Sequence, residues 1–385
     1  MNSRPLKILT VYYKEKPGGF CKRIRLKIEA YLDRGWEVHY IAVEPFPYTH
    51  ENLVPHILPT PMKRHDTLLF WSWFFLTVPF YILQTARRIE ADLLTSVSPV
   101  YACLAGPAKW LLKIPMLTLI LVKPANNTLW GKGQGFFLPV EYVMEKIGLM
   151  FSDVAYANSW GSGEAWKKTY GKAGRKIGVL PNNVEDPPFD KQKQRERLLA
   201  EFSLADNSFV ITNSGILEKR KNQACLIRAL AEVKHPHAVL LILGEGGERD
   251  ALQALADKLG VADRTILPGW RNDALALVQG SDAFVFPSFR EGMAESLLEG
   301  TTCRVPCLVS DIPENTDVVR NPEQHFPPDR PEILAEKIQR LIDDREYYDK
   351  LLETTLEDKE RFVFDWGGEI VQRTEELLKR SPQRE

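Results

Sequence analysis

Short apolar runs alternate with helical patterns through the second half of the chain, and this alternation restricts the possible folds most strongly. The runs are 209–213, 238–243, 265–267, 283–287 and 305–310. Between them, apolar residues recur at helical spacing, as in Leu252, Leu255 and Leu259 before the helix-ending Gly260. Strands that alternate with helices of this length form a parallel, doubly wound sheet. Such sheets bind ligands at the carboxyl ends of their strands, so we expect the polar, glycine-bearing stretches after these runs to converge.

The first half repeats this alternation less regularly, with strand candidates at 8–13, 38–43, 93–97 and 117–122. A chain of 385 residues is long for a single core. We therefore predict an α/β fold of two doubly wound, Rossmann-like domains that face each other across a cleft. The expected domains are 1–182 and 183–360, joined near the proline-rich stretch PNNVEDPPFD. Residues 361–385 are expected to form a helix that packs back on the N-terminal domain.

Charge is distributed unevenly, although the net charge of the whole chain is −1. Residues 1–180 carry an excess of about ten basic over acidic residues, and the remainder is correspondingly acidic. This asymmetry suggests that the first half meets an anionic surface or substrate. The basic residues belong to no recognised nucleic-acid-binding module, so nucleic acid is not an expected partner. The five cysteines are scattered without a metal-binding set, which fits free thiols in a reducing, cytoplasmic compartment.

Residues 67–86 form an uncharged and strongly aromatic segment between basic residues. Its length would suffice to cross a membrane. However, Pro79 and several polar residues interrupt it, and a span would separate the strand candidates 8–13 and 93–97, which look like parts of one sheet. The sequence therefore favours a buried or interfacial helix, with a membrane span as the alternative.

A basic helix start in the first half supports the same idea of a membrane contact. Four cations lie there among apolar residues: Lys22, Arg23, Arg25 and Lys27. Together with segment 67–86 they predict peripheral docking on an anionic membrane leaflet, namely the inner face of the cytoplasmic membrane. The alternative is a soluble protein whose basic helix face merely meets solvent.

The stretch FREGMAESLLEGT places Glu291 before Gly292 and Glu299 eight positions later, directly after the strand-like AFVFPS. Further pieces accompany it in order: GILEKRKNQ, LLILGEGGERDALQALADKLGV, ILPGWRND and CLVSDIPENTDVV. From about Asn158 to Asp317, and more loosely at PGGF near the N-terminus, the chain resembles a retaining GT-B glycosyltransferase. The resemblance is to the donor half of the large family numbered four, the glycosyl transferases group 1.

The resemblance implies a nucleotide-sugar site. Glu291 would accept hydrogen bonds from the donor sugar, and Glu299 would accept both ribose hydroxyls. Backbone N–H groups from Gly292 to Glu295 would face the sugar and the diphosphate. The alternative is that both glutamates are solvated helix-entry residues. The full set of implied donor-binding residues is Gly18, Gly19, Gly215, Arg220, Lys221, Gly244, Trp270, Arg271, Glu291, Gly292, Met293, Ala294, Glu295, Leu297 and Glu299.

The leaving diphosphate needs positive charge that strengthens as the sugar departs. By resemblance Lys221 supplies one cation, whereas the family's arginine position holds Ile216 here. Arg220 or Lys219 would then provide the second cation. Gly18 and Gly19 resemble the family's N-domain glycine loop.

The remaining implied positions concern the nucleotide base and the reacting carbon. Trp270 and Arg271 occupy the position where relatives line the base pocket, with ordinary surface packing as the alternative. Many relatives carry a His or Asp after the fourth strand of the N-domain. Here that stretch, LILVKPANNTLW, offers only Lys123, Asn126 and Asn127.

We therefore expect Glu291, Lys221 and Lys123 to carry the chemistry, with the leaving phosphate as the base. No Asp-x-Asp occurs in the chain, so neither a metal nor another cofactor is expected. The predicted activity is retaining glycosyl transfer from a nucleotide-diphosphate sugar, with UDP preferred to GDP. The acceptor would be a glycan or a lipid-linked glycan in cell-surface polysaccharide or glycolipid synthesis. The alternatives are a non-catalytic GT-B binding subunit and a GT-B sugar-nucleotide epimerase or phosphorylase.

Overall fold

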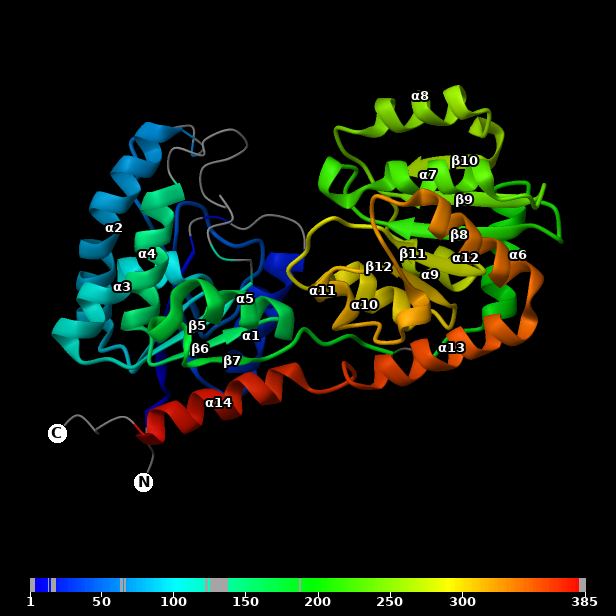
Figure 1. Cartoon of the computed structure of the whole chain (residues 1–385). Helices are drawn as coiled ribbons and strands as arrows, with labels where there is room; N and C mark the ends of the chain where they lie inside the picture. The colour runs from blue at the N-terminus through cyan, green and yellow to red at the C-terminus, as the bar shows by residue number, and fades with distance from the viewer. Residues whose placement is uncertain are drawn as a thin grey trace. The chain divides into compact units, whose positions relative to one another are not determined.

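The computed structural model describes residues 4–12, 14, 19–62, 65, 67–121, 124, 138–186 and 188–380. The chain divides into two compact units, which are described separately (Figure 1). The first unit comprises Met1–Asn182 and Asp365–Glu385, and the second comprises Asn183–Phe364. The first boundary lies where the sequence placed it, whereas the chain returns to the first unit at Asp365 rather than at residue 361.

The first unit contains a seven-stranded sheet in which every neighbouring pair of strands is parallel. In spatial order the strands are β3 (Leu53–Ile57), β2 (Glu37–Ala42), β1 (Lys7–Val11), β4 (Leu93–Ser96), β5 (Met116–Ile120), β6 (Val154–Ala157) and β7 (Ile177–Val179). The central strands are buried along almost their whole length because helices cover both faces of the sheet.

Six α-helices of the first unit are described: α1 (Gly19–Asp33), α2 (Leu68–Ile89), α3 (Pro99–Leu112), α4 (Leu138–Phe151), α5 (Trp160–Tyr170) and α14 (Trp366–Arg380). Helix α1 connects β1 to β2, toward one edge of the sheet. Helices α2, α3 and α4 connect β3 to β4, β4 to β5 and β5 to β6, in the opposite direction. Right-handed connections therefore place α1 on one face of the sheet and these three helices on the other. The returning helix α14 packs on α1, where the Tyr31 hydroxyl lies 2.9 Å from that of Thr374.

Helix α2 corresponds to the uncharged segment 67–86. Thr67 caps its start by accepting a hydrogen bond from the backbone N–H of Phe70. The inner side of the helix, including Phe74, Val78 and Ile82, is fully buried in the first unit. Among the described residues, α2 is the one helix long and apolar enough to cross a membrane, and 33% of its most apolar window is buried. The core helix of a soluble protein passes the same test of length and composition, so this finding alone does not establish a span.

Helix α1 does not form the basic docking surface expected from the sequence. Arg23 is only 1% exposed and Lys27 is fully buried. The Arg23 guanidinium lies over the ring of Trp366, and Arg25 is paired with Glu29 at 2.7 Å. That part of the prediction is wrong because two of the four cations point into the unit, where partners distant in the sequence take them up.

Lys27 is an unusual core residue, because its ammonium nitrogen has no exposure to solvent. Its Nζ donates hydrogen bonds to Thr10 Oγ1 at 3.2 Å and to Thr95 Oγ1 at 2.9 Å, which link α1 to β1 and β4. Neither partner carries a charge. Burial therefore lowers the pKa of Lys27 from 10.5 to about 7.

We expect replacement of Lys27 by methionine to stabilise the protein at neutral pH and to remove part of the dependence of stability on pH. Between pH 7 and 10.5 the unfolded chain binds a proton at Lys27 that the folded chain has released. The stability of the wild type should therefore rise with pH in this window, by up to about 1.4 kcal/mol per pH unit. Urea unfolding of both proteins at several pH values measures the difference, and equal slopes would contradict the assignment.

The second unit contains a six-stranded parallel sheet, which confirms the predicted pair of doubly wound domains. Its order is β10 (Thr265–Gly269), β9 (Ala238–Leu243), β8 (Phe209–Ser214), β11 (Ala283–Phe286), β12 (Cys307–Ser310) and β13 (His325–Phe326). Successive residues of a strand enter opposite cores: Val210 and Leu241 lie in one cluster, Ile211 and Leu240 in the other. The order reverses at β8, which lies between β9 and β11.

The helices of the second unit are α6 (Lys191–Glu201), α7 (Gln223–Glu232), α8 (Arg249–Leu259), α9 (Ala274–Gln279), α10 (Glu295–Thr301), α11 (Pro313–Thr316), α12 (Pro331–Asp343) and α13 (Arg345–Glu360). The point between β8 and β11 is a topological switch point, because the connections leave it in opposite directions. Ligands of doubly wound sheets bind outside the carboxyl ends of the strands at such a point.

Candidate functional site

The loops that follow β8 and β11 meet at this switch point. The backbone N–H of Phe289 donates to the carbonyl oxygen of Arg220 at 2.9 Å. Asn222 adds two contacts, since its side-chain amide donates to the carbonyl oxygens of Pro287 at 3.1 Å and Pro328 at 2.7 Å. Two loops that are about 70 residues apart in the sequence are therefore fixed side by side by main-chain and amide hydrogen bonds.

Glu291 occupies the centre of the site and pairs with two cations from the loop after β8. Its Oε1 lies 2.8 Å from the Nζ of Lys221, and its Oε2 accepts a hydrogen bond from Nη1 of Arg220 at 2.9 Å. The side chains of Glu291 and Lys221 are 6% and 11% exposed, whereas that of Arg220 is 37% exposed. The Lys221 ammonium also lies 4.9 Å from the centre of the Phe286 ring. The carboxylate and the lysine are thus desolvated, while the arginine still reaches solvent.

The electrostatics of this cluster favour the charged forms of Glu291 and Arg220. Burial raises the pKa of Glu291, but Lys221 and Arg220 together lower it by more, so the pKa lies below its usual value. Burial lowers the pKa of Arg220, but Glu291 and Glu218 raise it by more. Glu218 lies 2.6 Å from Nη2 of Arg220, which makes Arg220 a bridge between two carboxylates. The cluster therefore holds two cations in place with their charge already matched by acid side chains.

Glycines allow the loops after β8 and β9 to approach each other at the edge of this cluster. Gly244 has a φ of 148°, and a Cβ at this position would lie 2.0 Å from the carbonyl oxygen of Gly215. The backbone N–H of Gly215 donates to the carbonyl oxygen of Leu243 at 2.9 Å. A side chain at position 244 would therefore push apart the two loops that form one side of the site.

The predicted stretch from Gly292 to Glu299 follows β11 as a short turn and then forms α10. Met293, Ala294 and Leu297 are buried in the core below the site, whereas Glu299 is half-buried. Ala294 is the N-cap residue of α10 and cannot cap the helix with its side chain. Glu291 therefore precedes the turn, whereas Glu299 lies inside the seven-residue helix.

Trp270 and Arg271, the residues predicted to line the base pocket, follow β10 and have different surroundings. Trp270 is 67% exposed, and its Nε1 donates to Asn272 Oδ1 at 3.3 Å. Arg271 forms a two-point pair with Asp273 at 2.8 and 2.9 Å and lies 2.6 Å from Glu201. Hydrogen bonds from Arg271 lower the pKa of Asp273 to about 2. Arg271 thus ties β10 to α6 and α9, and Trp270 is the accessible member of the pair. The base-pocket role of both residues stays a prediction.

Three predicted positions bear on the first unit. Gly18 and Lys123 lie outside the described residues, as do Asn126 and Asn127 in the stretch after β5. Gly19 is the first residue of α1. The described residues of the cluster around Glu291 therefore all belong to the second unit.

Sequence reasoning missed several residues that position the cluster, namely Glu218, Asn222 and Phe286. Asn222 has a φ of 55°, a left-handed conformation that asparagine adopts more readily than most residues. An asparagine directly after the basic run was a usable signal for such a turn. The contact of the Phe286 ring with the Lys221 ammonium could not be predicted from the sequence. It depends on the pairing of β11, which ends at Phe286, with β8, which precedes Lys221.

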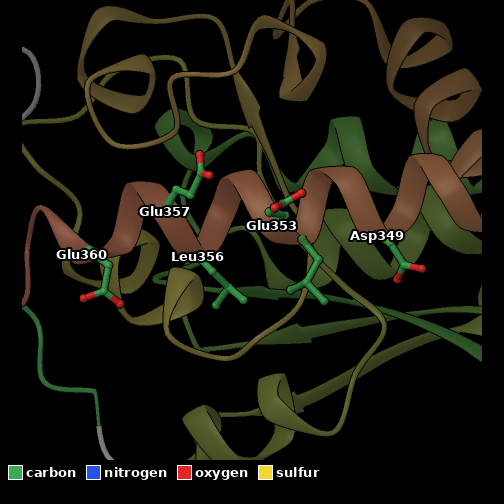
Figure 2. A pocket seen from close by; sticks show the side chains of 6 residues that line it. Asp349, Glu353, Leu356, Glu357 and Glu360 are labelled. Atoms are coloured by element: carbon green, nitrogen blue, oxygen red, sulfur yellow. The ribbon is translucent and has the colours of Figure 1, made fainter.

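A hollow of about 540 Å³ lies elsewhere in the second unit, along one face of α13 (Figure 2). Its polar lining consists of carboxylates: Asp349, Glu353, Glu357 and Glu360. Such a surface repels an anionic ligand, and none of its lining residues belongs to the loops after β8 and β11. Within the part of the chain that the structure describes, no group of three or more His, Cys, Asp or Glu side chains gathers that could hold a metal.

Comparison with solved structures identifies the fold. The chain is similar to the Anabaena protein HepE in complex with UDP-glucose, with a TM-score of 0.75 at 19% sequence identity. The similarity covers 96% of this chain and 100% of that chain. The protein therefore has the GT-B fold, with two Rossmann-like α/β units that each contain a parallel sheet.

Sequence comparison finds a family match within the second unit. Residues 194–357 match the family model of the glycosyl transferases group 1. The chain is 25% identical over 272 residues to an uncharacterized glycosyltransferase of Methanocaldococcus jannaschii, covering 68% of this chain and 66% of that protein. It is 34% identical over 155 residues to the UDP-Gal:alpha-D-GlcNAc-diphosphoundecaprenol alpha-1,3-galactosyltransferase of Escherichia coli, covering 38% of this chain and 39% of that protein. In both cases the match spans less than two thirds of the relative's own length.

Proposed function

We propose that this protein is a retaining glycosyltransferase that moves a sugar from a nucleotide-diphosphate sugar to a glycan or lipid-linked acceptor. The observation that carries the proposal is the buried cluster of Glu291, Lys221 and Arg220 at the switch point of the second sheet. A diphosphate needs cations held in a fixed position, and this cluster holds two of them at the place where doubly wound sheets bind ligands.

The chemistry proposed for the cluster is stabilisation of the leaving diphosphate. Lys221 and Arg220 would bind its oxygens, so Arg220 would take the part of the cation that Ile216 cannot supply. Glu291 would exchange its ion pairs for hydrogen bonds from the donor sugar, and Glu299 would accept hydrogen bonds from the ribose. The phosphate itself would act as the base. This arrangement requires no metal ion, because protein cations neutralise the departing charge.

Similarity to the two named proteins supports a particular donor and acceptor class. HepE was solved with UDP-glucose, and the galactosyltransferase of Escherichia coli uses UDP-Gal with a diphosphoundecaprenol-linked acceptor. We therefore propose a UDP-sugar as donor and a role in the synthesis of a cell-surface polysaccharide or glycolipid. With an acceptor on a lipid carrier, we propose that the protein works at the cytoplasmic face of a membrane, in peripheral contact with it.

The donor class can be tested by thermal unfolding with UDP, GDP, ADP and CMP in turn. A ligand at about 100 times its Kd should stabilise the protein by about 2.7 kcal/mol. We expect UDP to give the largest shift, and Glu299→Gln to abolish it because the ribose hydroxyls lose an ionised acceptor. Glu232→Gln, a change of the same kind at an exposed residue of α7, is the matched control and should keep most of the shift. A protein that responds to none of the four at millimolar concentration would contradict the proposal and favour a non-catalytic role.

A further inference from the structure

An apolar surface covers the outer side of three neighbouring helices in the first unit. Among the described residues, 11 of the 18 large apolar side chains that are exposed belong to α2, α3 and α4. The most exposed are Phe80 at 75%, Trp110 at 74%, Leu76 at 72%, Leu69 at 69% and Met150 at 67%. Exposed apolar patches of this kind usually mark an interaction site.

The helices that carry these exposed side chains lie side by side on one face of the sheet. α3 packs against both α2 and α4, and the three helices stand together in Figure 1. The outer face of α4 carries its own stripe at helical spacing: Val140, Val143, Ile147 and Met150. We call the exposed apolar residues of these helices the helical face. Its members are Leu68, Leu69, Leu76, Phe80, Trp110, Leu111, Val140, Tyr142, Val143, Ile147 and Met150.

Basic residues are the exposed charges within the three helices, whereas the exposed acids Glu90 and Asp153 lie just beyond the ends of α2 and α4. The exposed charges on the three helices are Arg87, Arg88 and Lys146, all of them basic. The acidic residues of these helices, Glu141 and Glu145, are 0% and 1% exposed. The three helices thus add exposed cations to the apolar surface, while the carboxylates within the same helices are buried.

This pattern distinguishes between the possible occupants of the face. A second copy of the chain would bring basic groups to an interface that offers no exposed acid on these helices to pair with them. A span would separate α2 from α3 and from the core in which Phe70, Phe74 and Val78 are fully buried. A lipid surface with anionic headgroups satisfies both features, since it takes up apolar side chains and attracts the basic rim.

We propose that the helical face seats the first unit in the interfacial layer of an anionic membrane, with α2, α3 and α4 parallel to the membrane plane. Trp110 and Tyr142 suit this layer, because their rings combine an apolar body with a polar group. The inference rests on the proposed function in one respect: that function supplies a membrane, which carries the acceptor, as the partner. It replaces α1 as the docking element, and it does not depend on sugar transfer by the second unit.

The test is flotation of the full chain with vesicles. One set contains phosphatidylcholine and phosphatidylglycerol in equal parts, and the other contains phosphatidylcholine alone. We expect the wild type to float with the anionic vesicles and the double variant Phe80→Gln/Trp110→Gln to partition at least about tenfold less, because two exposed apolar anchors are lost. The matched control is Leu259→Gln/Val363→Gln, which changes two exposed apolar residues of the second unit and should float like the wild type.

A second pair of variants tests the basic rim. Arg87→Gln/Lys146→Gln should lose the preference for anionic vesicles, whereas Lys193→Gln/Lys258→Gln, two exposed lysines of the second unit, should retain it. The thermal shift with UDP is measured on every variant and should stay unchanged. This separates a failure of membrane binding from a failure of the donor site and confirms that each variant is folded.

Three results would overturn the inference. The wild type could fail to float with either set of vesicles. The variant Phe80→Gln/Trp110→Gln could float as well as the wild type. Light scattering could show a dimer of the wild type that this variant loses, and the face would then be an interface between two copies.

Discussion

Replacing Lys221 by alanine is expected to lower kcat for sugar transfer by about 100-fold or more. The charge on the diphosphate grows as the bond to the sugar breaks, and removal of one fixed donor from such a site costs a factor of about 100 to 1,000. Lys221 suits this role because its side chain is only 11% exposed and its ammonium is held between Glu291 and the Phe286 ring. The measurement is the steady-state rate of nucleotide release with the donor that the thermal shift selects.

Lys219→Ala provides the matched control for this experiment. Lys219 and Lys221 belong to the same three-residue turn, but Lys219 is exposed and Lys221 faces the cluster. We expect Lys219→Ala to retain nearly the full rate. Equal losses in the two variants would mean that general positive charge, rather than a positioned cation, carries the effect, and no loss in either would remove Lys221 from the mechanism.

Glu291→Gln is expected to change donor turnover and nucleotide binding in opposite directions. Turnover should fall about 100-fold, because the amide cannot replace an ionised acceptor for the donor sugar. UDP should bind more tightly, by up to about tenfold, because Lys221 and Arg220 no longer have their charges matched by a carboxylate. Titration calorimetry with UDP and the nucleotide-release rate measure the two effects separately.

Glu299→Gln gives the contrast that makes this result interpretable. Both substitutions remove one negative charge near the same ligand, yet Glu299→Gln should weaken UDP binding because that side chain is proposed to bind the ribose. A Glu291→Gln protein that binds UDP more weakly than the wild type would show that Glu291 supports the nucleotide directly. The proposal that Glu291 exchanges its ion pairs for hydrogen bonds from the donor sugar would then be wrong.

The alternation of strands and helices was sufficient to predict both sheets, because period and spacing are local properties of the sequence. It also placed the loop of Lys221 and the loop of Glu291 at one edge of the second sheet. Adjacent parallel strands bring the loops after their carboxyl ends together, which is why residues about 70 positions apart could be assigned to one site.

Predictions failed where a charged side chain found a distant partner. Arg23 and Lys27 were expected to face a membrane, but Trp366 and the hydroxyls of two strands draw them into the unit. A helical pattern shows which residues share a face, and it does not show whether the cations of that face are paired internally.

The return of the chain to its first unit has a consequence for synthesis of the protein. Helix α14 completes the surface of α1 through contacts such as that of Tyr31 with Thr374, but it follows the whole of Asn183–Phe364 in the chain. A ribosome adding about 5–20 residues per second needs on the order of ten to forty seconds for that interval. During this time the nascent first unit exposes the side of α1 that α14 later covers, whereas the second unit emerges as one uninterrupted segment. The order of translation thus gives the later unit the earlier opportunity to reach its native state.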